Sequence, residues 1–194
     1  LLLNVNPHEI RLAVMEEGHL TDFETERPGQ DGLMNRVYKG VVRNIVPQIQ
    51  GIFVDIGIWR NAFLRMSDLP RSRKEPLTEG ASLLVQVTRE ETATKGPCVT
   101  GDVSFPGRYA VVLTDTDYIG ISKQIHEENR RRALRETGRR ICPPGTGLIL
   151  RTAAGDADPE ELEKELRKLT ALRDTVLRRA RLARAPSLLY REGD

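Results

Sequence analysis

A run of short strand-like segments between residues 37 and about 100 restricts the fold of this chain more than any other feature. Glycine or proline separates the segments, and apolar residues recur with a period of two. The five strands expected are residues 37–45, 51–56, 62–66, 83–88 and a short one near 99. Many short strands at such spacing are typical of a small closed barrel, because closure leaves no unpaired edge. The pattern favours an OB-type barrel, with an SH3-like barrel as the alternative.

The segments before the barrel predict a small antiparallel meander. Strands are expected at residues 1–5, 10–14 and 20–25, where apolar residues alternate with polar or small ones. Three short strands cannot bury a core and therefore need a partner. A charged, glycine-bearing stretch at residues 26–32 predicts the boundary to the barrel, and the polar stretch 70–79 predicts a loop.

The last third of the chain mixes strands and helices, so we expect an α+β fold overall. A strand pair is expected at residues 109–113 and 118–122, joined by a turn at 114–117. A helix is expected at 127–137, ended by Gly138 at its C′ position, and a further strand at 147–152.

A second helix is expected to begin after Asp158. Asp158 can accept hydrogen bonds from the first free N–H groups, and Pro159 suits the first helical position. Pro186 marks the end of this segment. Apolar residues then recur at helical spacing and predict one buried face: Leu162, Leu166, Leu169, Val176, Leu177 and Ala180.

Composition excludes several classes of protein. Apolar residues make up 39% and charged residues 30%, and no apolar stretch is long enough to cross a membrane. The two cysteines, Cys98 and Cys142, lie far apart, which argues against a disulfide framework or a zinc site and fits a reducing cytoplasm. The net charge is only +2, but residues 129–140 hold six arginines against one glutamate. Such a basic segment either binds phosphates or is a solvated helix face that keeps the protein soluble.

One candidate binding surface lies on the predicted barrel. If Ile52 and Val54 fill the interior, Phe53 points outward, because alternate residues of a strand face opposite sides. An outward ring can stack on unpaired bases, each stack contributing roughly 1–3 kcal/mol. The alternative is that Phe53 belongs to the core. Phe63 raises the same question, and four cations are placed to meet phosphates: Lys39, Arg43, Arg60 and Lys95.

A second candidate site is the pair Arg151 and Thr152 at a predicted strand end. The planar guanidinium of an arginine suits phosphate, and a threonine adds a hydroxyl donor. Gly107 would allow a backbone N–H to approach an anion closely. An Arg-Thr pair is common, however, and is usually structural.

A search for catalytic groups finds no convincing set. His8, His19 and His126 have no Cys or Ser partner at a suitable spacing. Asp115 and Asp117 offer carboxylates that magnesium prefers, but turn chemistry explains them adequately. A small metal-dependent nuclease in its own right is therefore the weakest of the functions considered.

Eight short strings occur together in a recognisable order and resemble the ribonuclease E/G family, its G branch more closely than its E branch. They cover nearly the whole chain: Leu2-Leu3-Asn4-Val5, Val37-Tyr38-Lys39-Gly40, Phe53-Val54-Asp55-Ile56-Gly57, Ala62-Phe63-Leu64, Thr94-Lys95-Gly96, Pro106-Gly107-Arg108-Tyr109, Gly120-Ile121-Ser122 and Leu150-Arg151-Thr152-Ala153-Ala154. Each string is weak alone, but the ordered set is specific.

The resemblance implies a layout. Residues 1–31 would form the first half of a split RNase H-like subdomain, and 32–102 an S1 domain, an OB-type five-stranded barrel that binds single-stranded RNA. Residues 103–186 would form an α/β 5′ sensor that recognises a 5′-monophosphate, and 187–194 the start of the second half of the RNase H-like subdomain.

The resemblance also assigns roles to single residues. Phe53, Phe63 and Lys95 match the family's RNA-contacting positions in the S1 domain, and Lys39 and Arg43 are added from their place near the rings. The family's 5′-phosphate site matches four positions, at which an arginine grips the phosphate, a threonine adds a hydrogen bond and the other two support the end nucleotide: Arg151, Thr152, Gly107 and Val111.

The resemblance finally implies an activity. We expect the RNA-binding and 5′-sensing portion of a bacterial, cytoplasmic endoribonuclease that acts in rRNA and tRNA processing and mRNA decay. The magnesium-binding carboxylates and the paired-cysteine zinc link of the family are not in this chain, so we expect it to bind no metal and to be inactive alone. The whole enzyme is expected to form a homo-oligomer. The alternative is a stand-alone S1/OB-fold RNA-binding module without nuclease activity.

Overall fold

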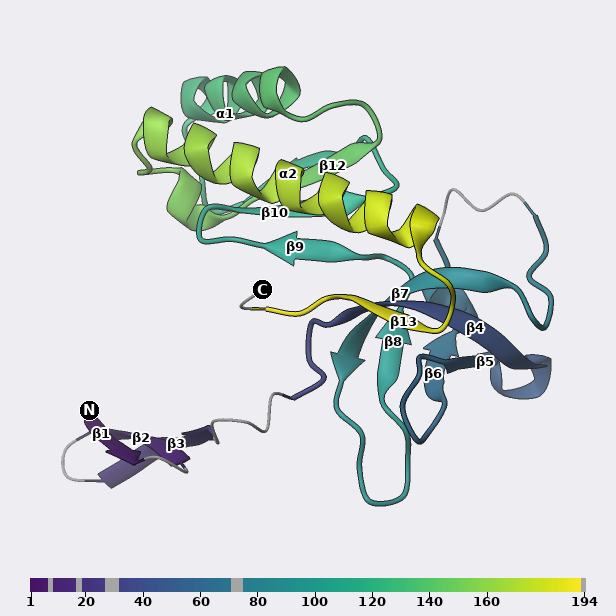
Figure 1. The fold of residues 1–194 in the computed structure, drawn as a ribbon. Coiled ribbons are helices and arrows are strands. Elements are labelled where there is room, and N and C mark those ends of the chain that lie inside the picture. Colours follow the sequence, from purple (N-terminus) through teal and green to yellow (C-terminus); the bar gives the residue numbers. More distant parts are fainter. Residues whose placement is uncertain (7–8, 17–18, 27–31, 71–74, 193–194) are drawn as a thin grey trace. The chain divides into compact units, whose positions relative to one another are not determined.

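The computed structural model describes residues 1–6, 9–16, 19–26, 32–70 and 75–192, which fall into two compact units, Leu1–Leu33 and Met34–Asp194 (Figure 1). The first unit is an antiparallel sheet of β1 (Leu2–Asn6), β2 (Glu9–Glu16) and β3 (His19–Glu26), in the order β1-β2-β3. The three predicted strands are therefore present. The boundary predicted at 26–32 falls mostly on residues 27–31, which lie outside the described residues, as do residues 71–74 of the predicted loop.

The second unit contains a closed barrel of five strands. They are β4 (Val37–Val46), β5 (Gly51–Asp55), β6 (Ala62–Arg65), β7 (Ser82–Arg89) and β8 (Cys98–Thr100). The hydrogen-bonded order is β4-β5-β6-β8-β7, and pairing of β7 with β4 closes the ring. β6 and β8 run parallel, whereas the other neighbours run antiparallel. This closed mixed barrel is consistent with the OB-like architecture predicted from the strand spacing.

The barrel interior follows the predicted alternation. On β5, Ile52 and Val54 are fully buried while Phe53 between them is half-buried. On β6, Ala62 and Leu64 are buried and Phe63 between them is half-buried. A period of two therefore places the aliphatic side chains inside and both phenylalanines outside.

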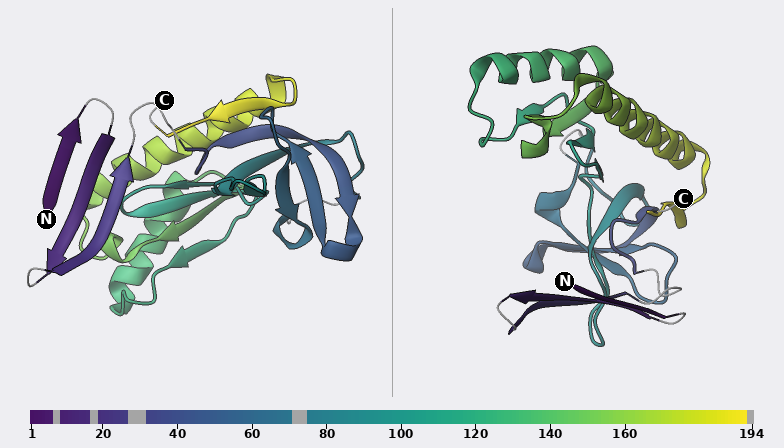
Figure 2. Two further views of the ribbon diagram at one scale, coloured as in Figure 1. Left: turned by 90° about the horizontal axis from the view of Figure 1, so that it is seen from below. Right: turned by 90° about the vertical axis from the view of Figure 1, so that its left-hand side faces the viewer.

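The end of the chain returns to the barrel. Strand β13 (Ser187–Tyr190) pairs antiparallel with β4, where Ser187 lies opposite Lys39 (Figure 2). β13 thus extends the barrel sheet by a sixth strand. Within the described residues, this pairing ties the end of the chain to the same unit as the barrel.

A second sheet has four strands in the order β11-β12-β10-β9. They are β9 (Ser104–Pro106), β10 (Ala110–Thr114), β11 (Ile119–Ile121) and β12 (Thr146–Leu150). The prediction that residues 109–113 and 118–122 pair with each other is wrong, because β12 lies between β10 and β11. The chain leaves β11, passes through a helix and returns as β12 parallel to β11, a crossover that a short-range turn pattern does not reveal.

Both helices cover one face of this sheet (Figure 1). Helix α1 spans Glu128–Ile141 and helix α2 spans Pro159–Leu182. The prediction that Gly138 ends the first helix is wrong, since α1 continues to Ile141. Gly138 is buried against the sheet, and a Cβ there would lie 2.7 Å from Leu148 Cδ2. The glycine thus permits close packing of helix and sheet, and Pro143 and Pro144 follow the true helix end.

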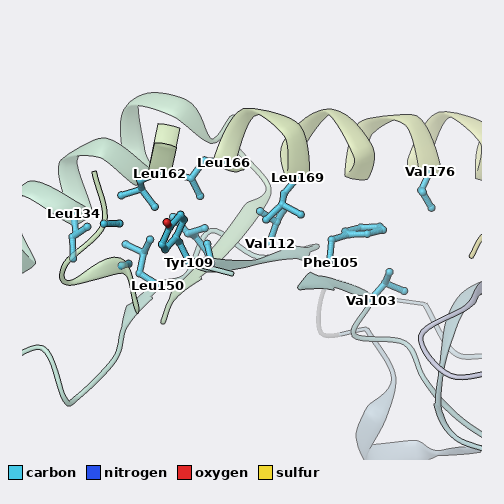
Figure 3. Close-up of a cluster of buried hydrophobic side chains, with 14 of the residues drawn as sticks. Val103, Phe105, Tyr109, Val112, Leu134, Leu150, Leu162, Leu166, Leu169 and Val176 are labelled. Carbon is cyan, nitrogen blue, oxygen red and sulfur yellow. The ribbon is translucent and has the colours of Figure 1, made fainter. Parts of the chain in front are cut away.

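The core of this part lies between α2 and the sheet (Figure 3). Leu162, Leu166 and Leu169 of α2 are buried against strands that contribute Phe105 and Val112. The predicted helix start is confirmed, because Asp158 accepts hydrogen bonds from the N–H groups of Glu160 (2.8 Å) and Glu161 (3.3 Å). No helix in the described part of the chain is long and apolar enough to cross a membrane.

Candidate nucleic-acid interface

Two aromatic rings lie side by side on the outer surface of β5 and β6. Phe53 and Phe63 are directly opposite each other in the strand register. Their ring centroids are 5.8 Å apart and the ring planes meet at 64°, an edge-to-face arrangement. Both side chains remain partly exposed, while the residues on either side of each fill the interior. The prediction that Phe53 points outward is therefore confirmed, and the alternative of a core Phe53 is excluded.

The Phe63 ring lies over the backbone of the neighbouring strand at Gly51. A Cβ at Gly51 would stand only 2.3 Å from Phe63 Cε2, so the absence of a side chain there makes room for the ring. The two rings thus form an apolar patch on the second and third strands of the barrel. On OB-type barrels this is the face on which oligonucleotides bind, together with the loop between the fourth and fifth strands.

Lys95 lies in the loop between β7 and β8, the fourth and fifth barrel strands. The loop turns at residues 92–95, where the Thr92 N–H donates to Lys95 O (2.9 Å). It returns beside β6, because the Phe63 N–H donates to Pro97 O (2.8 Å). Lys95 is exposed on this loop. The fold therefore brings the loop that carries Lys95 next to β6, the strand that carries Phe63.

Arg43 and Asp55 form an ion pair at the edge of this surface. Arg43 Nη2 lies 2.6 Å from Asp55 Oδ2, and the Gly57 N–H donates to Asp55 Oδ1 (2.8 Å). Hydrogen bonding from Arg43 first, and from Gly57 second, holds the pKa of Asp55 below its ordinary value. The carboxylate neutralises much of the charge that Arg43 would offer to a phosphate.

The structure separates Lys39 from the rings. Lys39 lies on β4 between β7 and β13, opposite Leu84 and Ser187. Its Nζ donates to Ala183 O (2.9 Å) just beyond the end of α2. A lysine at a helix C-terminus satisfies free carbonyl oxygens and complements the helix dipole. The observed contact of Lys39 is therefore structural.

Arg151 and Thr152 follow the last residue of β12, where the parallel strands β11 and β12 end side by side. Thr152 Oγ1 lies 2.9 Å from Ser122 Oγ and donates to Gln124 Oε1 (3.1 Å). The Arg151 N–H donates to Tyr109 O (2.8 Å), while its guanidinium is exposed. The fold thus sets a cation beside a cluster of exposed hydroxyl and amide groups.

Gly107 and Val111 lie at the same end of the sheet, at the turn from β9 to β10. Val111 is opposite Ile149 of β12, two residues before Arg151. The Gly107 N–H donates to Ala110 O (2.7 Å), which closes the turn. All four residues predicted to hold the 5′ phosphate are thus gathered at one end of one sheet, although they come from separate segments of the chain.

The turn after Gly107 already holds an anion from the protein itself. Glu165 of α2 accepts hydrogen bonds from the backbone N–H groups of Arg108 (3.0 Å), Tyr109 (2.7 Å) and Ala110 (3.1 Å). A Cβ at Gly107 would lie 2.6 Å from Glu165 Oε1, so the glycine permits this close approach. We expected backbone N–H groups at this turn to approach an anion. In this structure that anion is the Glu165 carboxylate.

Sequence reasoning did not identify Glu165, Ser122 or Gln124. Ser122 and Gln124 contact Thr152, and Glu165 contacts the turn that follows Gly107. These contacts form only because elements far apart in the sequence meet in the fold. Their spacing in the sequence carries no signal for this.

A second carboxylate on α2, Glu161, accepts a hydrogen bond from the Tyr109 hydroxyl (2.7 Å), and this bond is the main reason why the pKa of Tyr109 is raised.

The two carboxylate candidates, Asp115 and Asp117, lie in the connection between β10 and β11. Asp117 Oδ1 accepts a hydrogen bond from the Gly145 N–H (2.5 Å), so its carboxylate closes a turn. Asp115 has a positive φ of 68°, as a turn residue does. Among the described residues, no group of three or more His, Cys, Asp or Glu side chains is placed to hold a metal ion. His8 lies outside the described residues.

Comparison with known proteins agrees with the resemblance of the sequence motifs. The chain is 33% identical to ribonuclease G of Haemophilus influenzae over 208 aligned residues, which cover 99% of this chain and 42% of that protein. Ribonuclease G of Escherichia coli is 32% identical with the same coverage. Ribonuclease E of a Synechocystis species is 36% identical over 167 residues, 81% of this chain and 25% of that protein.

Among solved structures, the RNase P protein from Thermotoga maritima aligns with 35% of the chain at 22% identity, but the TM-score of 0.26 is too low to support an argument. The chain spans less than half the length of the ribonuclease G and E relatives that it matches. Residues 104–194 match the sequence profile of the Ribonuclease E/G family. By sequence, therefore, the chain belongs to the ribonuclease E/G family.

Proposed function

We propose that the chain is the RNA-binding and 5′-monophosphate-sensing portion of an endoribonuclease that cleaves single-stranded RNA in rRNA and tRNA processing and in mRNA decay. The observation that carries this proposal is the pair Phe53 and Phe63 on the second and third strands of an OB-like barrel. Partly exposed rings on this face suit unpaired bases, since every base has a flat π-surface. The family relationship supplies RNA as the substrate class.

In this proposal the barrel residues 32–102 form the S1 domain and bind the RNA strand. The rings stack on bases while Lys95 attracts the phosphates. Residues 103–186 form the 5′ sensor, in which Arg151 binds the terminal phosphate through its planar guanidinium. Thr152 adds a hydrogen bond after giving up its contact with Gln124. Residues 1–31 and 187–194 belong to a split RNase H-like subdomain.

Hydrolysis belongs to parts of the enzyme that follow these subdomains. There, magnesium held by carboxylates would activate water for attack on the phosphodiester, and zinc bound by paired cysteines would join subunits of a homo-oligomer in the bacterial cytoplasm. This chain alone binds RNA without cutting it. Its contribution to the reaction is to hold the single strand and to select its 5′ end.

The decisive experiment compares two RNAs that differ only at the 5′ end. Fluorescence anisotropy at one fixed salt concentration is expected to show tighter binding of a 5′-monophosphorylated single strand than of its 5′-hydroxyl form. Arg151→Gln should abolish the difference by weakening only the phosphorylated RNA, about 10- to 150-fold, the range for hydrogen bonds to charged groups. Arg132→Gln, which removes the same charge from an exposed position on α1, is the matched control and should keep the difference.

Equal affinity of the unmodified chain for both RNAs would reject the sensing role. It would favour a stand-alone S1/OB-fold RNA-binding module. Loss of binding to both RNAs in Arg151→Gln would also contradict the assignment, because Arg151 would then contact the strand rather than its end.

A further inference from the structure

Trp59, the chain's only tryptophan, is among the most exposed large side chains of the barrel. It lies in the connection between β5 and β6, and 71% of its surface is accessible. Tryptophan is enriched at interfaces, because its ring offers a large apolar surface and an N–H donor. Neither the family motifs nor the roles proposed above use this residue.

The Trp59 ring is nevertheless held in place. Arg60 Cζ lies 3.9 Å from the ring centroid, over one face of the indole. The indole Nε1–H donates to Glu91 Oε1 (3.3 Å) in the connection that follows β7. Arg60 in turn donates to Thr92 O (3.3 Å) and Ala93 O (2.9 Å). Since Arg60 covers one face and most of the ring is accessible, the opposite face is open to solvent.

The Trp59 ring lies in the connection that joins the strands of the two phenylalanines. β5 leads from Phe53 to Asp55 and then into the connection that carries Trp59, and the chain returns along β6 to Phe63. The contacts of Arg60 join this connection to the turn at residues 92–95, which carries Lys95. Trp59 therefore lies at the end of β5 and β6 where the turn with Lys95 meets the connection between these two strands.

We propose that Trp59 is a third stacking site for single-stranded RNA on this barrel, which takes an unpaired base on the ring face opposite Arg60. The inference rests on the function proposed above and lengthens the strand that the barrel binds. A ring fixed by a cation on one face and by a hydrogen bond at its edge is ordered before RNA arrives, so stacking costs little conformational entropy. Exposed Lys95, in the turn that Arg60 contacts, would meet the backbone phosphate.

Because Trp59 is the only tryptophan, its fluorescence reports on this site alone. Titration of the chain with an unlabelled 5′-hydroxyl oligoadenylate should quench the tryptophan emission. The RNA concentration at half-maximal quenching should equal the concentration for half-maximal binding, measured by the anisotropy of the same RNA carrying a fluorescent label. Trp59→Ala should weaken binding roughly 5- to 150-fold, the range for loss of one stacked base. Trp59→Phe keeps a ring and should retain most of the affinity. Tyr118→Ala removes an equally exposed ring outside the barrel and should change nothing.

The outcomes separate this inference from the function on which it rests. RNA binding without quenching, or with unchanged affinity in Trp59→Ala, would overturn the third stacking site and leave the binding role of Phe53 and Phe63 intact. Failure of the unmodified chain to bind single-stranded RNA would overturn both. Quenching with an unchanged midpoint in Phe53→Ala would place the RNA on Trp59 without Phe53 and would also contradict a continuous surface.

Discussion

On the barrel, Phe53 and Phe63 present ring surface from two regular strands, whereas Arg151 and Thr152 present a guanidinium and a hydroxyl just beyond the end of β12. Aromatic rings stack on any base, and the strength of this stacking does not depend on how far the base lies from the 5′ end. A guanidinium beside hydroxyl groups responds to charge, which is concentrated at a 5′-monophosphate. The two regions therefore suit different tasks, holding a strand and selecting its end, and variants should separate them.

The largest effect is expected from the barrel rings. Phe53→Ala should weaken binding of single-stranded RNA about 5- to 150-fold, because one stacked base is lost. The loss should be the same for 5′-monophosphorylated and 5′-hydroxyl RNA, in contrast to Arg151→Gln, when both are measured by anisotropy. Phe53→Tyr keeps the ring and serves as control. A loss that depended on the 5′ end would remove the distinction between the two regions.

A smaller effect, on stability, is expected from Glu165. Glu165→Ala removes the shared acceptor of three backbone N–H groups and should lower the free energy of unfolding by about 1–3 kcal/mol, measured by urea denaturation. Glu163→Ala is the matched control, since this carboxylate of the same helix pairs with Arg140 and Arg167 at the surface and should matter less. Binding of 5′-hydroxyl RNA should be unchanged. Equal losses in the two variants would show that the turn does not depend on Glu165.

The smallest effect concerns pH. Arg43 and the Gly57 N–H lower the pKa of Asp55 in the folded state, so ionised Asp55 stabilises the fold above its unfolded pKa. This contribution is lost as the pH falls through the lower folded value. Asp55→Asn should therefore reduce the dependence of unfolding free energy on pH in the acid range, measured by urea denaturation at several pH values. Arg43→Met removes the main donor and should act in the same direction. An unchanged pH profile in both variants would refute the role of the pair.

Features that depend on neighbours in the sequence were predictable. The alternation in residues 51–56 placed Phe53 outside and Ile52 inside, because side-chain direction in a strand follows from a period of two. The start of α2 at Asp158 and Pro159 followed from local capping. Helical spacing correctly gave four of the six residues predicted for its buried face: Leu162, Leu166, Leu169 and Val176. The joint role of the rings and Lys95 in RNA binding was expected from resemblance to a family rather than from spacing, and it stays a prediction.

What depends on distant segments was decided only by the tertiary structure. The position of β12 between β10 and β11, the burial of Gly138 inside α1 and the contact of Lys39 with the end of α2 all require elements far apart in the sequence to meet. So does the Glu165 carboxylate that fills the turn after Gly107. Local periodicity sets the direction in which a side chain points, but packing of whole elements decides what it meets there, because many weak contacts between remote residues select one arrangement.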